Sequence, residues 1–171
     1  MVFENILEED TDDFFNWIRL KSEKFRFNKD LENIDLPDTY IPELGKCFKN
    51  SQYYHFFIEY DYFEGFASAI GAENKFIYHA FNVKDGLLSD FTFYSNMEEA
   101  RRWLVSLPDF YLGIKIPSIV MIDIFDRLEI TLDELRTSNS LAISLLIAYF
   151  IIDCGLDWDI HSFVSPIELS V

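Results

Sequence analysis

Three histidines and two cysteines are the residues of this sequence best suited to acid–base, metal or nucleophilic chemistry. They are His55, His79, His161, Cys47 and Cys154. His55 and His79 fall in segments that predict strands of one sheet, so they could be neighbours. Glu59 would share a face with His55 on a strand and could complete a metal site, because imidazole and carboxylate both bind zinc. The alternative interpretation is that each histidine packs and hydrogen bonds locally.

Neither cysteine has the sequence context of a nucleophile. Cys47 could pair with His55 as nucleophile and base, but nothing in the spacing enforces contact, and a free cysteine is usually a small apolar residue. Cys154 falls at a predicted helix end, where the negative pole of the dipole disfavours a thiolate. Two cysteines also do not form a disulfide framework.

Motifs of the common enzyme classes are missing from the sequence. It has no P-loop, no glycine fingerprint for nucleotides, no paired CxxC, no HExxH and no Gly-x-Ser-x-Gly elbow. We therefore predict no catalytic residue, no cofactor and no metal, and we expect the protein not to be an enzyme.

Clustered carboxylates are the other candidates for function. Five of them lie within six residues near the N-terminus: Glu8, Glu9, Asp10, Asp12 and Asp13. Capping of a helix that begins there would use two or three of these side chains. The surplus predicts a docking patch for a basic protein, since the ligand spacing and glycine of a calcium-binding EF-hand are missing.

Two further segments mix acidic and aromatic side chains. Asp157 and Asp159 flank Trp158, and in such an arrangement the tryptophan can anchor a partner that the carboxylates attract. Alternatively, Trp158 packs over the end of the preceding helix. Asp61 and Glu64 belong to the other segment, at the first predicted hairpin. All these residues are predicted to bind a partner.

Residues 53–94 predict an antiparallel meander of about four strands. Their aromatic and β-branched residues favour strands, and their short connections exclude parallel crossovers. Lys84-Asp85-Gly86 is a hairpin signal. The predicted strands are 53–60, 63–70, 75–83 and 89–94.

Helices are predicted before and after this meander in the sequence. The first helix begins near Asp10 and ends at 28–30. A connection follows, with a short helix at 43–48. Ser95 and Glu98 match a capping box, which opens a helix that stops at Pro108.

The last third of the chain alternates between element types. Residues 109–116 predict an edge strand, and 119–128 favour a helix over a strand because their apolar positions repeat with helical period. Thr131 and Glu134 match a second capping box. An apolar helix at about 139–153 is too short to span a bilayer and predicts a buried core helix. The fold class is therefore α+β, with the helices packed against the sheet.

Length and charge limit the possible partners. The 171 residues predict a single domain, 1–171. Thirty acidic residues oppose fourteen basic ones, giving a formal net charge of −16 and a pI near 4.4. This field repels nucleic acid and acidic lipid and attracts a cationic partner, although solubility alone would also explain it. The N-terminus lacks a signal peptide pattern, so we expect a cytoplasmic, reduced protein.

In size, charge and acidic–aromatic segments, the chain resembles the immunity proteins of bacterial polymorphic-toxin and contact-dependent growth-inhibition systems. No family motif is matched, so no functional residue is carried over. The resemblance implies an inhibitor that binds and neutralises a cognate, basic toxin domain. The alternatives are an acidic chaperone of the type III secretion kind, a small enzyme that uses His55, His79 and Glu59, and a nucleic-acid mimic.

Overall fold

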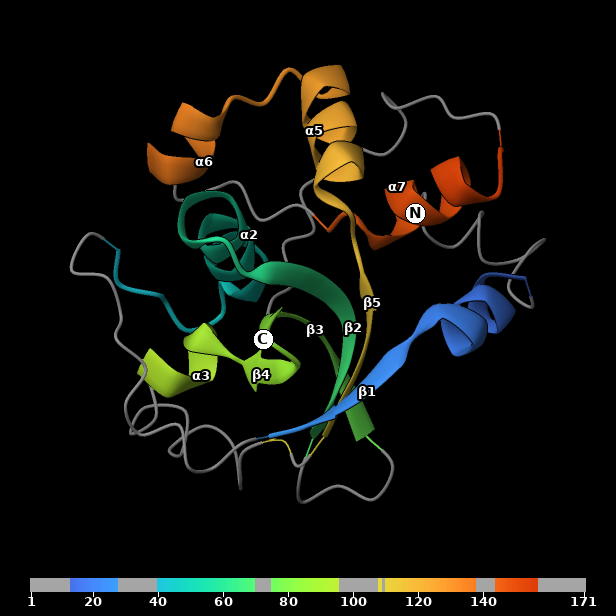
Figure 1. Ribbon diagram of the computed structural model, residues 1–171, viewed down its shortest axis with the longest axis horizontal. Coiled ribbons are helices and arrows are strands. Elements are labelled where there is room, and N and C mark those ends of the chain that lie inside the picture. Colours follow the sequence, from blue (N-terminus) through green and yellow to red (C-terminus); the bar gives the residue numbers. More distant parts are fainter. Residues whose placement is uncertain are drawn as a thin grey trace.

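The computed structural model describes residues 13–27, 40–69, 75–95, 108, 110–137 and 144–156, and the fold is α+β. Five antiparallel strands form one curled sheet in the order β1-β5-β2-β3-β4 (Figure 1). The strands are β1 (Glu23–Arg26), β2 (Asp61–Ala69), β3 (Lys75–Lys84), β4 (Leu87–Ser89) and β5 (Phe110–Lys115).

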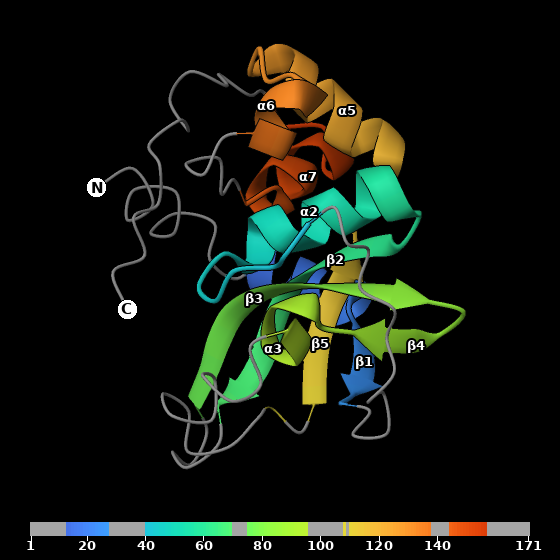
Figure 2. The same ribbon diagram turned by 90° about the vertical axis from the view of Figure 1, so that its left-hand side faces the viewer.

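Several of the helices cover one side of the sheet in two layers. Residues 13–21 are helical, and the other helices of the described part are α2 (Cys47–Ile58), α3 (Phe91–Ser95), α5 (Ser118–Arg127), α6 (Leu132–Thr137) and α7 (Leu146–Asp153). Figure 2 shows α2 between the sheet and the layer formed by α5, α6 and α7. One apolar core joins these layers, and it includes Phe48 of α2, Ala80 of β3 and Phe125 of α5. No helix among the described residues is long and apolar enough to cross a membrane.

Two of the predicted strands and their hairpin are present. The segments 63–70 and 75–83 correspond to β2 and β3, which pair over the full length of β2. Asp85 and Gly86 both have positive φ, 54° and 78°, as a two-residue hairpin turn requires. The helix predicted at 119–128 is confirmed as α5, and the second capping box forms, since Glu134 accepts from the Thr131 N–H at 2.8 Å.

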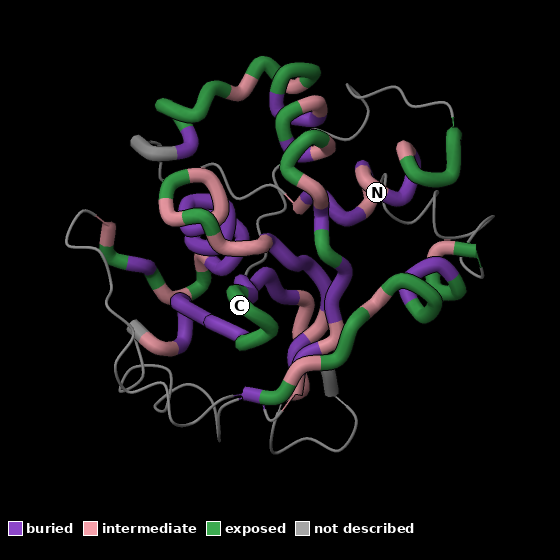
Figure 3. The backbone as a smooth tube through the Cα atoms, viewed as in Figure 1, coloured by how far each residue is buried: buried purple, intermediate pink, exposed green. Residues whose placement is uncertain are grey.

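The strand predicted at 53–60 is wrong, because these residues continue the helix α2. Every residue from 47 to 54 is buried (Figure 3). A helix that is buried on all sides has no polar face, so it shows no helical period, and its aromatic residues suggest a strand instead. The short helix predicted at 43–48 overlaps α2 only at its first two residues.

Three other boundaries differ from the predictions. The segment 89–94 is not a strand, because Asp90 caps α3 by accepting from the Phe93 N–H at 3.2 Å. The first helix ends at residue 21 instead of 28, and β1 follows it. The strand predicted at 109–116 is present as β5, but it lies inside the sheet, whose edges are β1 and β4. Residues 96–107 of the helix predicted from Ser95 to Pro108, and the start of the apolar helix near residue 139, lie outside the described residues.

Two glycines allow β2 and β5 to approach closely. Gly65 faces Gly113 across the ladder. A Cβ on Gly65 would lie 2.1 Å from the carbonyl oxygen of Leu112, and one on Gly113 would lie 2.6 Å from the ring of Phe81. The two strand backbones therefore lie close together at Gly65, and the ring of Phe81 occupies the space over Gly113.

Glu64 of β2 ties α7 to the sheet. Its carboxylate is fully buried and lies at the N-terminus of α7, where free N–H groups and the helix dipole favour an anion. Burial raises the pKa of Glu64, and the hydrogen bonds that it accepts oppose this rise. The donors are the hydroxyls of Tyr62 (2.5 Å), Tyr78 (2.8 Å) and Ser144 (2.7 Å) and the N–H groups of Leu145 (2.6 Å) and Leu146 (3.1 Å).

We predict that Glu64→Gln lowers the free energy of unfolding by about 1–3 kcal/mol, because an amide replaces one acceptor oxygen and leaves buried donors without a partner. Urea denaturation measures this. The matched control is Asp61→Asn on the same strand, whose half-exposed ion pair with Lys115 should contribute about 0–1 kcal/mol. Equal losses in the two variants would contradict the role of Glu64.

Candidate functional site

A buried cluster of reactive side chains surrounds His79 of β3. The hairpin register pairs Asn82 with Ser89, so Asp90, the residue after β4, is held close to the part of β3 that carries His79. Tyr111 reaches the same point from β5, and Cys47 reaches it as the first residue of α2. Four elements therefore converge on one imidazole.

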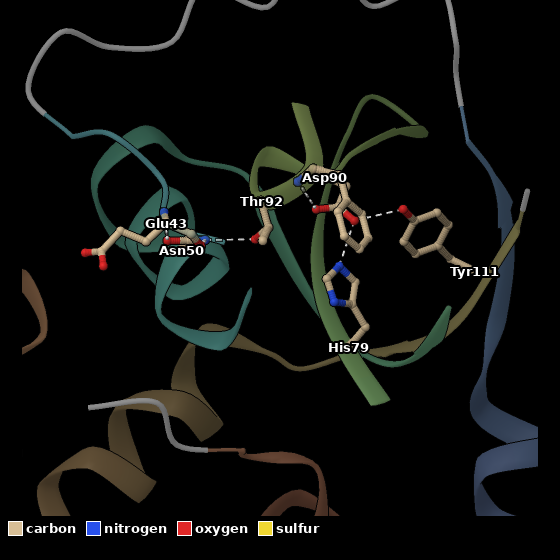
Figure 4. Close-up of polar contacts among 7 residues, drawn as sticks. Glu43, Asn50, His79, Asp90, Thr92 and Tyr111 are labelled. Atoms are coloured by element: carbon tan, nitrogen blue, oxygen red, sulfur yellow. Dashed lines mark hydrogen bonds and ion pairs between the residues drawn. The ribbon is translucent and has the colours of Figure 1, made fainter. Parts of the chain in front are cut away.

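Asp90 fixes the orientation of the imidazole. Its Oδ2 lies 2.7 Å from Nε2 of His79 and accepts from the Tyr111 hydroxyl at 2.8 Å (Figure 4). Its Oδ1 accepts from the Phe93 N–H. The ring of Phe93 also stacks on His79, with centroids 5.0 Å apart and planes at 14°. Both the position and the tilt of the imidazole are therefore set by neighbours.

The thiol of Cys47 lies near enough to the His79 side chain to raise its pKa. Because Nε2 of His79 faces Asp90, the ring nitrogen left for the thiol is Nδ1, which points away from Asp90 in Figure 4. Cys47 is 9% exposed and His79 is 3% exposed. The cluster therefore contains a thiol, an imidazole and a carboxylate in that order, largely shielded from water.

Charge at this site favours the imidazolium form of His79. Burial lowers the pKa of His79, but Asp90 and Cys47 outweigh it and raise this pKa to about 10. A cysteine beside a histidine can act as a nucleophile, with the histidine exchanging the proton. The arrangement can therefore supply both a nucleophile and a proton donor.

Two asparagines hold α2 in place beside this cluster. Asn50 donates to Thr92 of α3 at 2.8 Å and to the carbonyl oxygen of Glu43 at 2.8 Å, and it accepts from the Tyr40 hydroxyl at 2.7 Å (Figure 4). Asn82 of β3 donates to the carbonyl oxygen of Ser51 at 2.9 Å. These bonds fix the first turns of α2, and with them the thiol of Cys47.

His55, His79 and Glu59, the three residues that could have formed a metal site, do not come together as one. His55 lies on α2, where its Nδ1 faces the Tyr60 carbonyl oxygen at 2.6 Å and its Nε2 faces Ser118 at 3.0 Å. Glu59 ends the same helix in the left-handed conformation, with φ 61°. The described part of the chain holds no group of three or more His, Cys, Asp or Glu residues that could bind a metal ion. Cys47 accordingly pairs with His79 and not with His55.

Only three of the residues predicted to bind a partner lie in the described part of the chain: Asp13, Asp61 and Glu64. Asp13 is exposed, and Asp61 is half-exposed and paired with Lys115 at 2.7 Å. The prediction that Glu64 binds a partner is wrong, because its side chain points into the interior toward α7 and cannot belong to a docking surface. The remaining predicted residues, and His161, lie outside the described part of the chain: Glu8, Glu9, Asp10, Asp12, Asp157, Trp158 and Asp159.

Comparisons with known proteins add nothing to this geometry. No protein-family model, curated protein or solved structure matches the chain.

We predict that the stability of the protein falls as pH rises from about 6.5 to about 10, and that His79→Gln removes this part of the dependence. Below 6.5 the imidazole is charged in both the folded and the unfolded state, so its pairing with Asp90 contributes fully. Between the two values only the folded state keeps the proton, so the contribution is lost progressively. Urea denaturation across this range measures the slope.

His55 provides the matched control for this measurement. Burial lowers its pKa, so its effect on stability is confined to pH values below the ordinary value of 6.5. His55→Gln should therefore keep the slope of the wild type between 6.5 and 10. If His79→Gln also keeps that slope, the pairing of His79 with Asp90 does not stabilise the fold.

Proposed function

We propose that this protein is a thiol-dependent enzyme that transfers or hydrolyses acyl groups. Cys47 is the nucleophile, His79 exchanges protons and Asp90 orients His79. The observation that carries the proposal is the placement of one imidazole between the carboxylate of Asp90 and the thiol of Cys47. The same three roles are combined in cysteine and serine acyl-transfer enzymes of unrelated folds.

The reaction proceeds through a thioester. The thiolate of Cys47 adds to the carbonyl carbon of an amide, ester or thioester. His79 gives its proton to the leaving amine, alcohol or thiol as the bond to that group breaks, and the acyl group remains on the sulfur. His79 then takes a proton from water or from a second nucleophile, which attacks the thioester and releases Cys47.

The position of Cys47 at the start of α2 supports this role. The first N–H groups of a helix have no partner within the helix and lie at the positive end of its dipole. Lys46, the residue before Cys47, makes no side-chain cap on them. These groups can stabilise negative charge on the sulfur, and on a carbonyl oxygen during attack.

We predict that iodoacetamide alkylates Cys47 faster than Cys154 at slightly acidic pH, although Cys154 is the more exposed of the two. Cys47 has a histidine beside it to exchange protons, whereas burial and Asp153 raise the pKa of Cys154. His79→Ala should slow alkylation of Cys47 by about a hundredfold and leave Cys154 unchanged. Mass spectrometry of the digested protein measures both rates in one sample.

Acylation by p-nitrophenyl acetate provides the functional counterpart. Cys47 should gain one acetyl group and then lose it by hydrolysis, and Cys47→Ala should abolish this turnover. Asp90→Asn, which keeps the shape of the side chain, should slow it. Faster alkylation of Cys154 at every pH, together with acetylation that does not depend on His79, would exclude Cys47 as the nucleophile.

We also propose a second function, which follows the resemblance to immunity proteins: binding and neutralisation of a cationic toxin domain in the cytoplasm. The specific observation in its favour is the exposed carboxylates on the outer helices, among them Asp126, Asp133 and Glu134. An acidic chaperone function shares the same support. This binding does not need the thiol, so Cys47→Ala separates the two functions.

For the second function we predict a stable one-to-one complex with a basic toxin domain encoded beside this protein. Its association rate should fall as salt rises, because attraction between opposite charges is screened. Replacement of Asp12 and Asp13 by Lys should slow association if that patch docks, while Cys47→Ala should not change it. Stopped-flow fluorescence measures these rates, and rates that do not depend on salt would contradict electrostatic docking.

A further inference from the structure

The outer face of α5 exposes aliphatic side chains that a soluble helix normally buries. Ile119 is 73% exposed and Ile122 is 44% exposed. They border a shallow groove of about 390 Å³ between α5 and α7. Its lining is Ile119, Val120, Ile122, Asp123, Asp126 and Ile152. Contiguous aliphatic surface of this kind marks a place where another molecule packs.

Carboxylates border this groove and extend beyond it. Asp126 is exposed, and Asp123 is paired with Arg127 at 3.0 Å. Arg127 is the one basic residue in the sequence between 116 and 135. Further exposed carboxylates continue along the turn and α6 (Figure 3): Glu129, Asp133 and Glu134. The hydrogen bonds from Thr131 lower the pKa of Glu134 and keep it charged.

We propose that the α5 groove binds a cationic amphipathic helix of a partner protein. The aliphatic side chains of such a helix would pack on Ile119, Ile122 and Ile152, and its flanking Lys or Arg side chains would face Asp123 and Asp126. Charge selects this occupant, because an acidic helix would set like charges against Asp123 and Asp126, which is costly. Helix-in-groove binding uses this combination of apolar anchors and charged rims.

This inference goes beyond acyl transfer and does not rest on it. It also gives the proposed inhibitor function a docking surface other than the acidic segments near the chain ends. Neither Cys47 nor His79 lines the groove. The two proposals can therefore fail separately.

A synthetic peptide of leucine and lysine with helical spacing is the probe, and a leucine–glutamate peptide of the same pattern is its counterpart. The lysine peptide should bind, and its affinity should fall as salt rises. In a methyl-labelled sample the signals of Ile119 and Ile122 should shift. Fluorescence anisotropy should show about tenfold weaker binding for Ile122→Asp and for Asp126→Lys. Ile119→Asp, at a more exposed position, repeats the test without risk to folding.

Leu87 provides the matched control, because it is 54% exposed beside the exposed Asp85 in the hairpin between β3 and β4. Leu87→Asp and Cys47→Ala should both bind as the wild type does. Equal weakening by Leu87→Asp, or equal binding of the glutamate peptide, would overturn the proposal. So would a dimer that Ile122→Asp converts to a monomer, since the occupant of the groove would then be a second copy of this chain.

Discussion

A buried carboxylate must be paired with a cation or surrounded by hydrogen-bond donors, and the described part of this protein buries two of them. Among the described residues no cation pairs with Glu64, which accepts from five donors, two of them N–H groups at the start of α7. Asp90 combines an imidazolium with a hydroxyl and a backbone N–H. Each carboxylate draws together segments that are far apart in the sequence. The first fixes the outer helix layer on the sheet, and the second assembles the candidate site.

The helix α2 is the element that these two networks share. It is buried on both sides, with the sheet below and the outer helices above (Figure 2). Its interior polar residues are therefore used as connectors: Asn50 bonds to α3, and the Ser51 carbonyl oxygen accepts from Asn82 of β3. Because the start of α2 cannot shift without breaking these bonds, the thiol of Cys47 is held at a fixed distance from the sheet.

The sequence allowed much of the fold to be predicted, and less of the site. β2, β3 and their turn follow from local signals, as does the Thr131–Glu134 cap, because each depends on neighbours in the chain. The helix α2 could not be predicted in this way, since burial on all sides removes the period that marks a helix. The sequence marks His79 and Cys47 as residues that could do chemistry, but it offers His55 as the partner of Cys47. Their true pairing depends on contacts between four elements, and Asp90 was hidden in what looked like a strand.

Gly113 has a consequence that reaches the candidate site. Its missing side chain leaves room for the ring of Phe81, which meets the ring of Tyr111 edge to face at 5.1 Å. Tyr111 in turn donates to Asp90. Because aromatic rings are rigid, the rings of Phe81 and Tyr111 together fix the distance between the middle of the sheet and the carboxylate of Asp90. Gly113 has no side chain and contacts neither Asp90 nor His79, yet through these rings it helps to set the position of Asp90 beside His79.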